Sequence, residues 1–204
     1  MGGIPFIVSA PSGAGKTTLC KMAVDFFPDL RHSVSYTTRP PRPGETDGAD
    51  YCFVDDAEFD RMVEAGEFLE HAGVHGKRYG TARAGLAAVT ALGLDIILDI
   101  DVQGAEKIRR NLSGGVYIFI VPPSIDECRR RLTARAKDSD TEIDRRLKIA
   151  LEEISRAPEY EYIIVNDELD KAFDRLKSII IAERSKSSRM MDKVKKLFGA
   201  SGRD

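Results

Sequence analysis

Two short segments of the chain carry residues whose types and spacing suit the binding of phosphate groups. The first, S-A-P-S-G-A-G-K-T-T, runs from Ser9 to Thr18, and the second, S-Y-T-T-R-P-P-R-P-G-E, runs from Ser35 to Glu45. Glycines let a backbone curl until successive N–H groups face an anion, whereas guanidinium groups hold phosphate through charge-assisted hydrogen bonds. The sequence therefore offers one anion site made largely of backbone and a second made of side chains.

The first segment lies where a phosphate-binding loop needs to lie. It follows a short apolar run, residues 4–9, that predicts a buried strand, and it opens a helical pattern over residues 16–27. In that context the pattern G-x-x-x-x-G-K-[ST] predicts a nucleoside triphosphate site. Gly13 and Gly15 favour a curled anion nest, and the helix behind it adds its positive N-terminal end.

Side chains at the start of that helix complete the predicted site. Lys16 is expected to reach the β- and γ-phosphates, and the Thr17 hydroxyl is suited to hold Mg²⁺. Ala10 replaces the first glycine of the strict pattern, at the exit of the strand, where we expect a methyl group to be tolerated. The residues predicted to bind ATP in this segment are Ala10, Pro11, Ser12, Gly13, Ala14, Gly15, Lys16, Thr17 and Thr18.

The second segment places two arginines three residues apart among prolines. Proline fixes its own φ and pushes the preceding residue towards extended conformations, so Arg39 and Arg42 are held in a stiff loop. A pre-ordered pair of guanidinium groups loses less entropy when it binds an anion. We therefore interpret this pair as a clamp for a second phosphate.

Composition places both sites in an ordinary globular protein. The chain has 204 residues, 42% hydrophobic and 31% charged, which is enough for one well-buried core with small inserted lobes. The formal net charge of -2 gives no overall basic field, so we expect local anion binding and no nucleic-acid partner. No apolar run is long enough to span a bilayer, and residues 4–10 lack the basic leader of a signal peptide, so we expect no membrane partner.

The cysteines favour a reducing compartment. Cys20, Cys52 and Cys128 are odd in number, far apart and without a C-x-x-C pair, which suggests neither a zinc site nor a disulfide framework. We expect free thiols that act as small hydrophobic side chains in a cytoplasmic protein.

Short apolar runs alternate with helical patterns along most of the chain. Near-continuous apolar strands suit a parallel sheet that is covered on both faces, and the alternation favours an α/β core with right-handed crossovers. The predicted strands are 4–9, 94–100, 116–121 and 162–165. The predicted helices are 16–27, 103–111, 124–136, 142–155 and 168–183.

Two segments interrupt that alternation. Residues 31–93 contain a cluster of turn residues and then two apolar runs, 51–54 and 68–72, on either side of a helical pattern at 55–65. This arrangement predicts a small mixed lobe inserted into the core. Residues 124–157 form a second insertion that is almost entirely helical and rich in arginine.

The last helical pattern, residues 187–198, is amphipathic. Its apolar face carries Met190, Met191, Val194, Leu197 and Phe198, with lysines opposite. Such a helix can bind a membrane surface or a partner, but more often it docks on the core of its own domain. We expect the docked arrangement, and the other two remain open.

Further motifs follow the arginine pair along the chain. In order, the motifs are S-x-T-T-R-x-x-R-x-G-E from Ser35, D-G-x-D-Y-x-F from Asp47, E-x-A-x-x-x-G-x-x-Y-G-T from Glu70, I-D-x-Q-G from Ile100, R-x-x-x-R from Arg131, R-L at Arg146 and N-D at Asn166. This combination resembles the guanylate kinase family, nucleoside monophosphate kinases that act on GMP. The resemblance covers essentially the whole chain. It implies an α/β fold with a three-layer core of the P-loop NTPase type around a parallel sheet, an inserted mixed α/β GMP-binding lobe, and a helical lid.

The resemblance also implies where these parts begin and end. The core would comprise 1–31, 93–123 and 158–204, the GMP-binding lobe 32–92 and the lid 124–157, as a single guanylate-kinase-like unit over 4–184. Ala136 stands where the family commonly has glycine, which leaves the behaviour of the lid hinge open.

Each matched residue acquires a role from the same resemblance. The expected GMP-binding residues are Arg39, Arg42, Tyr51 and Tyr79 at the phosphate, and Ser35, Glu70, Thr81 and Asp101 around guanine. The expected catalytic residues are Lys16, Arg131, Arg135 and Arg146, the three arginines reaching over the ATP phosphates from the lid. Asn166 would lie near adenine. Asp99 or Asp101 would orient the Mg²⁺ shell, Asp99 through water, or else cap the next helix.

Physical chemistry agrees with these implied roles. Two arginines and two phenols supply a dianion with donors whose geometry lysines could not match. Guanine offers N1–H and N2–H₂ to one carboxylate, Glu70, and the Ser35 hydroxyl can donate to O6, whereas adenine has an acceptor at N1. No general base is needed because the acceptor phosphate is already anionic, so we interpret His32, His71 and His75 as structural.

The implied activity is the transfer of phosphate from ATP to GMP, giving ADP and GDP with Mg²⁺, in purine nucleotide metabolism and GMP recycling. We expect a monomer or a small homo-oligomer. One alternative is a non-catalytic guanylate-kinase-like module that binds a phosphopeptide, but such modules typically lose the phosphate loop. Another is a related kinase for a phosphorylated sugar, which has no need of a guanine pocket.

Overall fold

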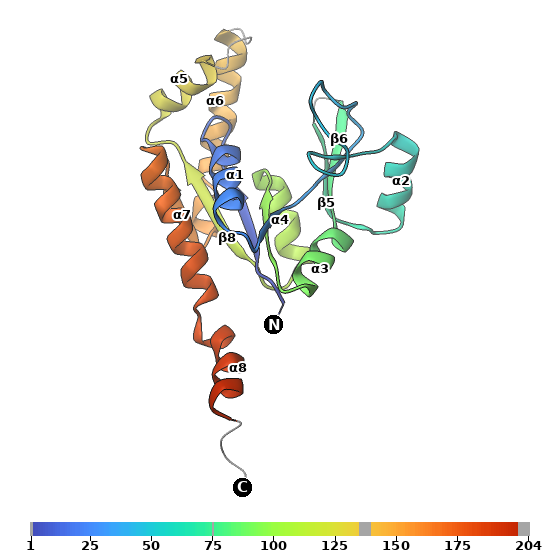
Figure 1. Cartoon of the computed structure of the whole chain (residues 1–204). Coiled ribbons are helices and arrows are strands. Elements are labelled where there is room, and N and C mark those ends of the chain that lie inside the picture. The colour runs from blue at the N-terminus through green and yellow to red at the C-terminus, as the bar shows by residue number, and fades with distance from the viewer. Residues whose placement is uncertain (1, 75, 135–139, 200–204) are drawn as a thin grey trace.

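A five-stranded parallel sheet forms the centre of the protein (Figure 1). The computed structural model describes residues 2–74, 76–134 and 140–199. The strand order is β2-β7-β1-β8-β9, and each neighbouring pair is parallel. The strands are β1 (Pro5–Ser9), β2 (Leu30–His32), β7 (Asp95–Asp99), β8 (Val116–Val121) and β9 (Tyr162–Val165). The predicted parallel sheet is confirmed, and the short β2 is an addition to the predicted strands.

Helices cover both faces of this sheet. Successive side chains of a strand point to opposite faces, so Val8 packs in one cluster with residues of α1 (Lys16–Phe26) and α7 (Leu169–Arg184). Ile7 packs in the other cluster, with residues of α3 (Arg83–Ala91) and α4 (Val102–Asn111). This is the expected three-layer core, although α3 was not among the predicted helices.

A second, four-stranded sheet builds the small lobe. Its order is β4-β3-β6-β5, with antiparallel pairs except β3 and β4. Phe59, Met62, Phe68 and Ala82 give the lobe a buried cluster of its own. The elements are β3 (Tyr36–Thr37), β4 (Cys52–Phe53), α2 (Asp56–Glu64), β5 (Phe68–Val74) and β6 (Lys77–Ala82). Neither β3 nor β6 was predicted from the sequence, because both strands are largely polar.

The helical insertion that is predicted to act as a lid has two helices, α5 (Ile125–Ala134) and α6 (Asp140–Ile154), followed by a short 3-10 turn, Ala157–Glu159. Cys128, Leu132 and Ile143 belong to the cluster that holds the two helices together. The lid and the small lobe rise from the same end of the large sheet, on either side of the start of α1 (Figure 1). Ala136 and the hinge question attached to it lie outside the described residues.

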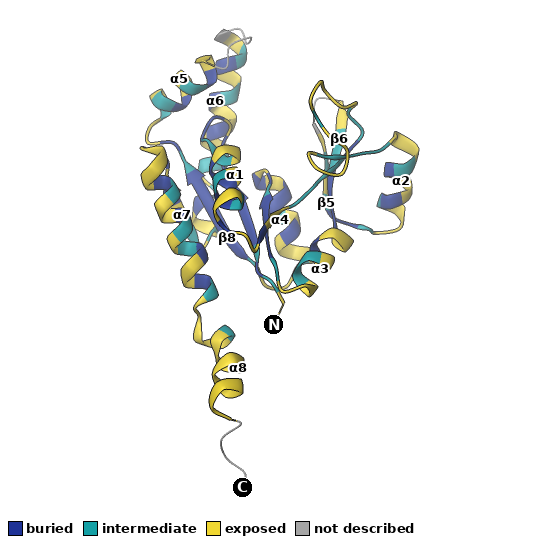
Figure 2. Cartoon of the chain, viewed as in Figure 1, coloured by how far each residue is buried: buried dark blue, intermediate teal, exposed yellow. Residues whose placement is uncertain are grey.

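The C-terminal helix α8 (Ser187–Phe198) differs from the prediction. None of its residues is buried, and it points away from the core as a continuation below α7 (Figure 2). The expected docking on the core is wrong; the end of α7 and the start of α8 are held instead by polar contacts with residues near the amino ends of the core strands. Arg184, at the end of α7, bonds the Asp95 carboxylate over 2.7 Å and lies 2.8 Å from Asp29, and Arg189 donates to the Gly2 carbonyl over 3.4 Å.

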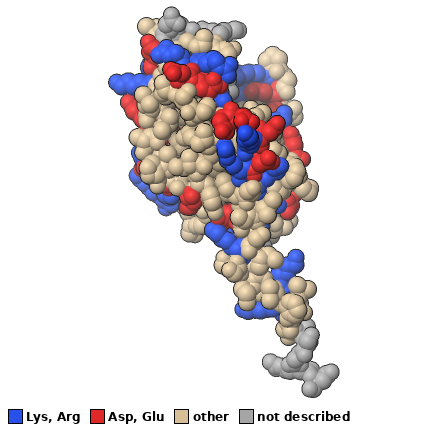
Figure 3. All heavy atoms as spheres, turned by 90° about the vertical axis from the view of Figure 1, so that its left-hand side faces the viewer, with Lys and Arg blue, Asp and Glu red and all other residues tan. Residues whose placement is uncertain are grey.

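Charges of both signs are mixed on one face of the molecule, and the cysteines are free thiols. On the face seen in Figure 3, Lys and Arg side chains lie among Asp and Glu side chains instead of forming a field of one sign. All three cysteines are free, and Cys20 and Cys128 are buried, which confirms their use as small hydrophobic side chains. Within the described ranges, every helix is too short or too polar to cross a lipid bilayer.

Candidate active site

The loop between β1 and α1 has the curled shape that its glycines predict. Gly13 and Gly15 have φ values of 86° and 89°, in the left-handed region, and Gly15 caps the N-terminus of α1. A Cβ atom on Gly15 would lie 2.4 Å from Nδ2 of Asn166, so glycine is required there by conformation and by space. Ala10 is buried in the main core, which explains why this position accepts a methyl group.

A pocket of about 260 Å³ opens along this loop. It is lined by Ala10, Pro11, Ser12, Gly13, Ala14, Gly15, Lys16, Thr17, Asp101 and Glu153. The Lys16 ammonium group donates to the Ile100 carbonyl over 2.6 Å and lies 2.5 Å from a carboxylate oxygen of Asp99. The cation that is expected to reach a triphosphate is therefore held at the carboxyl end of β7.

The loop is also held from its outer side. Nδ2 of Asn166 donates to the Ala14 carbonyl over 2.7 Å, and the Cys128 thiol lies 3.4 Å from the Ser12 carbonyl oxygen. Glu153 of α6 lines the same pocket, and burial raises the pKa of its carboxylate. Sequence reasoning missed Cys128 and Glu153, because no local pattern indicates that distant lid residues contact the loop.

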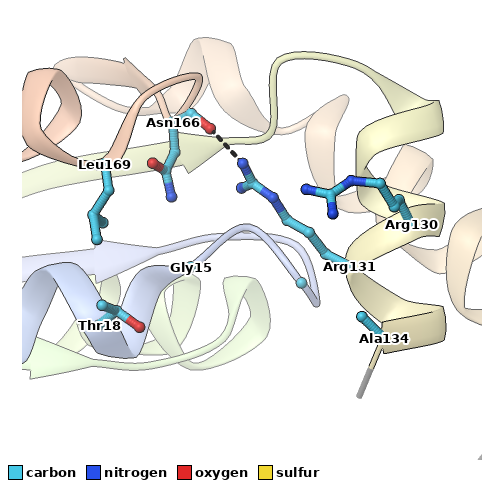
Figure 4. A pocket seen from close by; sticks show the side chains of 8 residues that line it. Gly15, Thr18, Arg130, Arg131, Ala134, Asn166 and Leu169 are labelled. Atoms are coloured by element: carbon cyan, nitrogen blue, oxygen red, sulfur yellow. Dashed lines mark hydrogen bonds between the residues drawn. The ribbon is translucent and has the colours of Figure 1, made fainter. Parts of the chain in front are cut away.

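A second part of this region, about 380 Å³ in volume, lies beyond the loop (Figure 4). It is lined by Gly13, Gly15, Thr18, Arg130, Arg131, Ala134, Asn166 and Leu169. Arg131 reaches from α5 across the loop and donates to the Asn166 carbonyl over 3.0 Å. Asn166 thus touches the loop through its side chain and the lid through its backbone, and its buried amide is a structural element as well as a candidate adenine neighbour.

The lid arginines occupy different positions. Arg131 lines the pocket and also bonds Glu127 over 2.7 Å, and the hydrogen bonds from Arg130 and Arg131 lower the pKa of Glu127 to about 2. Arg146 lies on α6, where its Nε donates to Glu142 over 3.3 Å, and it lines none of these pockets. Arg135 lies outside the described residues.

A separate pocket of about 220 Å³ lies between the small lobe and the core. Its lining is Ser35, Tyr51, Glu70, Ala72, Tyr79, Asp99, Ile100 and Asp101. Thr81 stands opposite Glu70 in the β5–β6 ladder, and its hydroxyl donates to the Glu70 carboxylate over 2.8 Å. The structure therefore gathers the residues predicted around guanine from the lobe and from the end of β7.

Burial makes Glu70 an unusual carboxylate. Desolvation raises its pKa, the Thr81 hydrogen bond opposes that shift, and the nearby Asp101 adds to it. Asp101 accepts a hydrogen bond from the Gly104 N–H over 2.7 Å and caps α4, so the capping alternative is confirmed for this residue. A half-buried carboxylate without a full set of donors suits a ligand that presents N–H groups.

The arginine pair is only partly assembled. Arg39 lies with its guanidinium carbon 5.3 Å from the centre of the Tyr51 ring, and Glu45 and, to a smaller extent, Tyr79 raise the pKa of its guanidinium group. The rings of Tyr51 and Tyr79 are 6.0 Å apart. Arg42 is exposed and does not line the pocket. The structure thus brings one of the two predicted arginines to the two phenols.

The two pockets meet at the carboxyl end of β7. Asp99 and Ile100 line the lobe pocket, and the same two residues bind the Lys16 ammonium group of the phosphate loop. Ligands of open parallel sheets bind at this edge. Two phosphorylated ligands bound in these pockets would face one another across Lys16, which is the geometry needed for direct transfer of a phosphoryl group.

The histidines that the structure describes do not contribute to the phosphate-loop pocket or to the lobe pocket. His32 and His71 line neither pocket, and His75 lies outside the described residues. Across residues 2–74, 76–134 and 140–199, the structure has no group of three His, Cys, Asp or Glu side chains suited to a metal ion.

Comparisons with known proteins agree with this geometry. A sequence model described as guanylate kinase matches residues 3–183. The guanylate kinase of Geobacter sulfurreducens is 55% identical over 196 residues, which cover 96% of this chain and 97% of that protein. The guanylate kinase of Syntrophotalea carbinolica is 51% identical over 202 residues, or 99% and 96% of the two chains. The crystal structure of guanylate kinase from Anaplasma phagocytophilum superposes with a TM-score of 0.71 at 36% identity, covering 97% and 96%.

Substitution of Gly15 tests the close approach of the loop to Asn166. Gly15→Ala should lower the free energy of unfolding more than Gly44→Ala, because both glycines have φ near +90° but only Gly15 faces an atom. We expect about 1–2 kcal/mol of backbone strain in each variant, and about 1–3 kcal/mol more in Gly15→Ala from the displaced amide. Urea unfolding measures both, and equal losses would contradict the assigned contact.

Substitution of Glu70 tests its raised pKa. A carboxylate whose pKa is raised on folding opposes folding when ionised, so Glu70→Gln should raise Tm at pH 7. The advantage over wild type should shrink as the pH falls through the raised pKa, since both side chains are then neutral. Calorimetric scans from pH 7 to pH 4 measure it. Glu64→Gln, on the exposed face of α2, should show no such trend, and a lower Tm for Glu70→Gln at pH 7 would refute the cause.

Proposed function

The chain belongs to the guanylate kinase family, and we propose that its two pockets hold ATP and GMP at the same time for one in-line phosphoryl transfer. The reaction of the family converts ATP and GMP into ADP and GDP. The observation that carries this assignment is the shared end of β7, where Lys16 of the phosphate loop bonds residues that also line the lobe pocket.

We propose that the lobe pocket selects guanine. Glu70, held by Thr81, would accept N1–H and N2–H₂ together, while Ser35 would donate to O6 and Asp101 would close the pocket from the core side. Adenine would set its N1 acceptor against the Glu70 lone pairs. A buried polar site rejects such a mismatch because its groups keep their full desolvation cost.

The acceptor phosphate would be held by Arg39, Arg42, Tyr51 and Tyr79. Arg39 and the two phenols already lie together, which supports this role. Arg42 is three residues further along the same loop and would have to turn inwards when the phosphate is present. No group needs to remove a proton, since the attacking oxygen of the phosphate is already anionic.

The donor side would be formed by the loop and the lid. The loop amides and Lys16 would hold the ATP phosphates, Arg131 lies close enough to approach them from the lid, and Asn166 would lie near adenine. Arg135 and Arg146 remain proposed lid residues on the strength of the family pattern. When the lid closes, water is excluded as a competing phosphoryl acceptor.

We propose Mg²⁺ as the cofactor. Thr17 carries a hydroxyl at the phosphate pocket, and Asp99 has a carboxylate at its edge, so the available oxygen atoms fit a hard cation that arrives with the nucleotide. Bound Mg²⁺ would neutralise charge on the transferring phosphate. Thr17 would hold it directly, and Asp99 would orient its water.

The division into core 1–31, 93–123 and 158–204, lobe 32–92 and lid 124–157 is likewise our proposal. Separate clusters in the lobe and the lid support it, whereas Leu86 of α3 packs with the large sheet, which ties the end of the lobe segment to the core. Free thiols support a cytoplasmic protein. A monomer or a small homo-oligomer that handles these two nucleotides without nucleic acid or membrane completes the proposal.

Two rival functions of this fold are less well supported. A phosphopeptide-binding module would not need the intact loop with Lys16 and Thr17. A kinase for a phosphorylated sugar would not need Glu70 and Ser35 in a half-buried pocket. The choice of acceptor in an ADP-release assay separates all three.

Replacement of Lys16 should impair the proposed ATP site and leave the proposed GMP site intact. Lys16→Ala should lower kcat for GMP phosphorylation by about 10²–10³-fold or more, because a charge aimed at the transferring phosphate is lost. GMP affinity, measured by calorimetry, should stay close to that of wild type. Lys21→Ala, on the exposed side of α1, is the control and should be fully active. Loss of GMP affinity in step with activity would sink the two-site assignment.

Base selectivity is tested on Glu70. Glu70→Gln changes little volume but places an amide donor where guanine also donates, so kcat/KM for GMP should fall about tenfold or more. The ratio of GMP to AMP activity should narrow. A coupled ADP-release assay with GMP, AMP and ribose bisphosphate measures it on wild type, Glu70→Gln and the control Glu64→Gln. An unchanged GMP-to-AMP ratio would remove Glu70 from the base pocket.

A further inference from the structure

The loop that carries the arginine pair contains one acidic side chain, Glu45, which the mechanism above does not use. Its carboxylate takes two hydrogen bonds from Arg39, from Nη1 to Oε2 over 2.9 Å and from Nη2 to Oε1 over 2.8 Å. The two side chains are only 12% and 20% exposed. This parallel pairing of a guanidinium group with a carboxylate fixes orientation far better than a single contact does.

The same carboxylate also fixes the backbone of the loop. Oε2 of Glu45 accepts a hydrogen bond from the Arg42 N–H over 2.7 Å, and the Glu45 N–H donates to the Arg42 carbonyl over 3.0 Å. Pro43 and Gly44, with φ of 90°, occupy the centre of this turn, as a type II turn prefers. Glu45 therefore joins both arginines, one through its side chain and the other through its main chain.

Glu45 and the Pro40 carbonyl together use three of the N–H donors of Arg39. A guanidinium group has five N–H donors. Nη1 spends its two on Glu45 and the Pro40 carbonyl, which is 2.8 Å away, and Nη2 gives one to Glu45. The Nε–H and the second Nη2–H lie side by side on the remaining edge, and such a parallel pair matches two oxygens of a phosphate.

We propose that Glu45 is a positioning residue of the acceptor site: it grips the far end of Arg39 so that the Nε–Nη2 edge is presented to the phosphate of GMP. The inference rests on the proposed function of this pocket and deepens it. Glu45 does not touch the nucleotide. It acts through Arg39, whose guanidinium group it holds by two hydrogen bonds.

The direction in which GMP affinity changes when Glu45 is replaced distinguishes a positioning role from a simple effect of its charge. A carboxylate close to a dianionic phosphate repels it, so loss of the Glu45 charge would by Coulomb's law alone tighten GMP binding. A positioning role predicts the opposite, because a released Arg39 must be ordered again at every binding event.

The test compares Glu45→Gln with wild type by calorimetry, using GMP and guanosine as the two ligands. Gln offers one oxygen and one N–H₂ group, so it cannot accept both Arg39 hydrogen bonds. GMP affinity should fall about tenfold, the loss of one charged hydrogen bond, while guanosine, which has no phosphate, should bind as before. In steady-state assays KM for GMP should rise with KM for ATP unchanged. Glu67→Gln, which loses an ion pair to Arg61 in the same lobe, is the matched control.

Two further variants make the outcome decisive. Glu45→Asp keeps the charge but shortens the reach, so it should weaken GMP binding as well. In an Arg39→Ala background, Glu45→Gln should have little further effect if it acts through Arg39. Tighter GMP binding by Glu45→Gln, or an equal loss with and without Arg39, would overturn the inference. If wild type binds GMP no better than guanosine, the clamp itself and the proposed function of the pocket fail, which is a different result.

Discussion

Lys16 stands between the two pockets, and its contacts with the end of β7 are the interactions on which the site depends. The parallel order of the sheet places β1 next to β7, so the loop that follows β1 lies beside Asp99 and Ile100. Both residues also line the lobe pocket. The two pockets are therefore brought together by strand order, because the loop after β1 and the end of β7 lie side by side in the sheet.

Four cations of the predicted site, Lys16, Arg39, Arg131 and Arg146, share a second property, because each has a carboxylate partner. A phosphate site needs positive charge, but the chain has a net charge of -2, and unpaired arginines close together would repel one another. Pairing lets the groups remain ordered, and phosphate oxygens then compete with carboxylate oxygens for the same donors. The pairs are Lys16 with Asp99, Arg39 with Glu45, Arg131 with Glu127 and Arg146 with Glu142.

The sequence predicted those parts of the protein whose cause is local. Gly13 and Gly15 adopt the left-handed conformations that the loop pattern requires, and apolar runs became the strands of the large sheet. The polar strand β6 and the outward course of α8 were not foreseen, because ladder pairing and the Arg184–Asp95 contact join residues far apart in the chain. The same applies to the contacts that lid residues make with the loop.

The lobe pocket contains a carboxylate, Glu70, that costs stability in the free protein. Its pKa is raised by burial, and Asp101 adds a second negative group nearby. The ionised Glu70 side chain therefore lowers the stability of the folded protein relative to a neutral side chain at this position. Thr81 and the nearby Lys107 relieve only part of this cost, because the pKa of Glu70 remains raised despite them. A guanine base supplies two N–H donors at once. Under the proposed function, the carboxylate that costs stability in the free protein would be the group that gains most from guanine, and selectivity would come from a cost that only this ligand offsets.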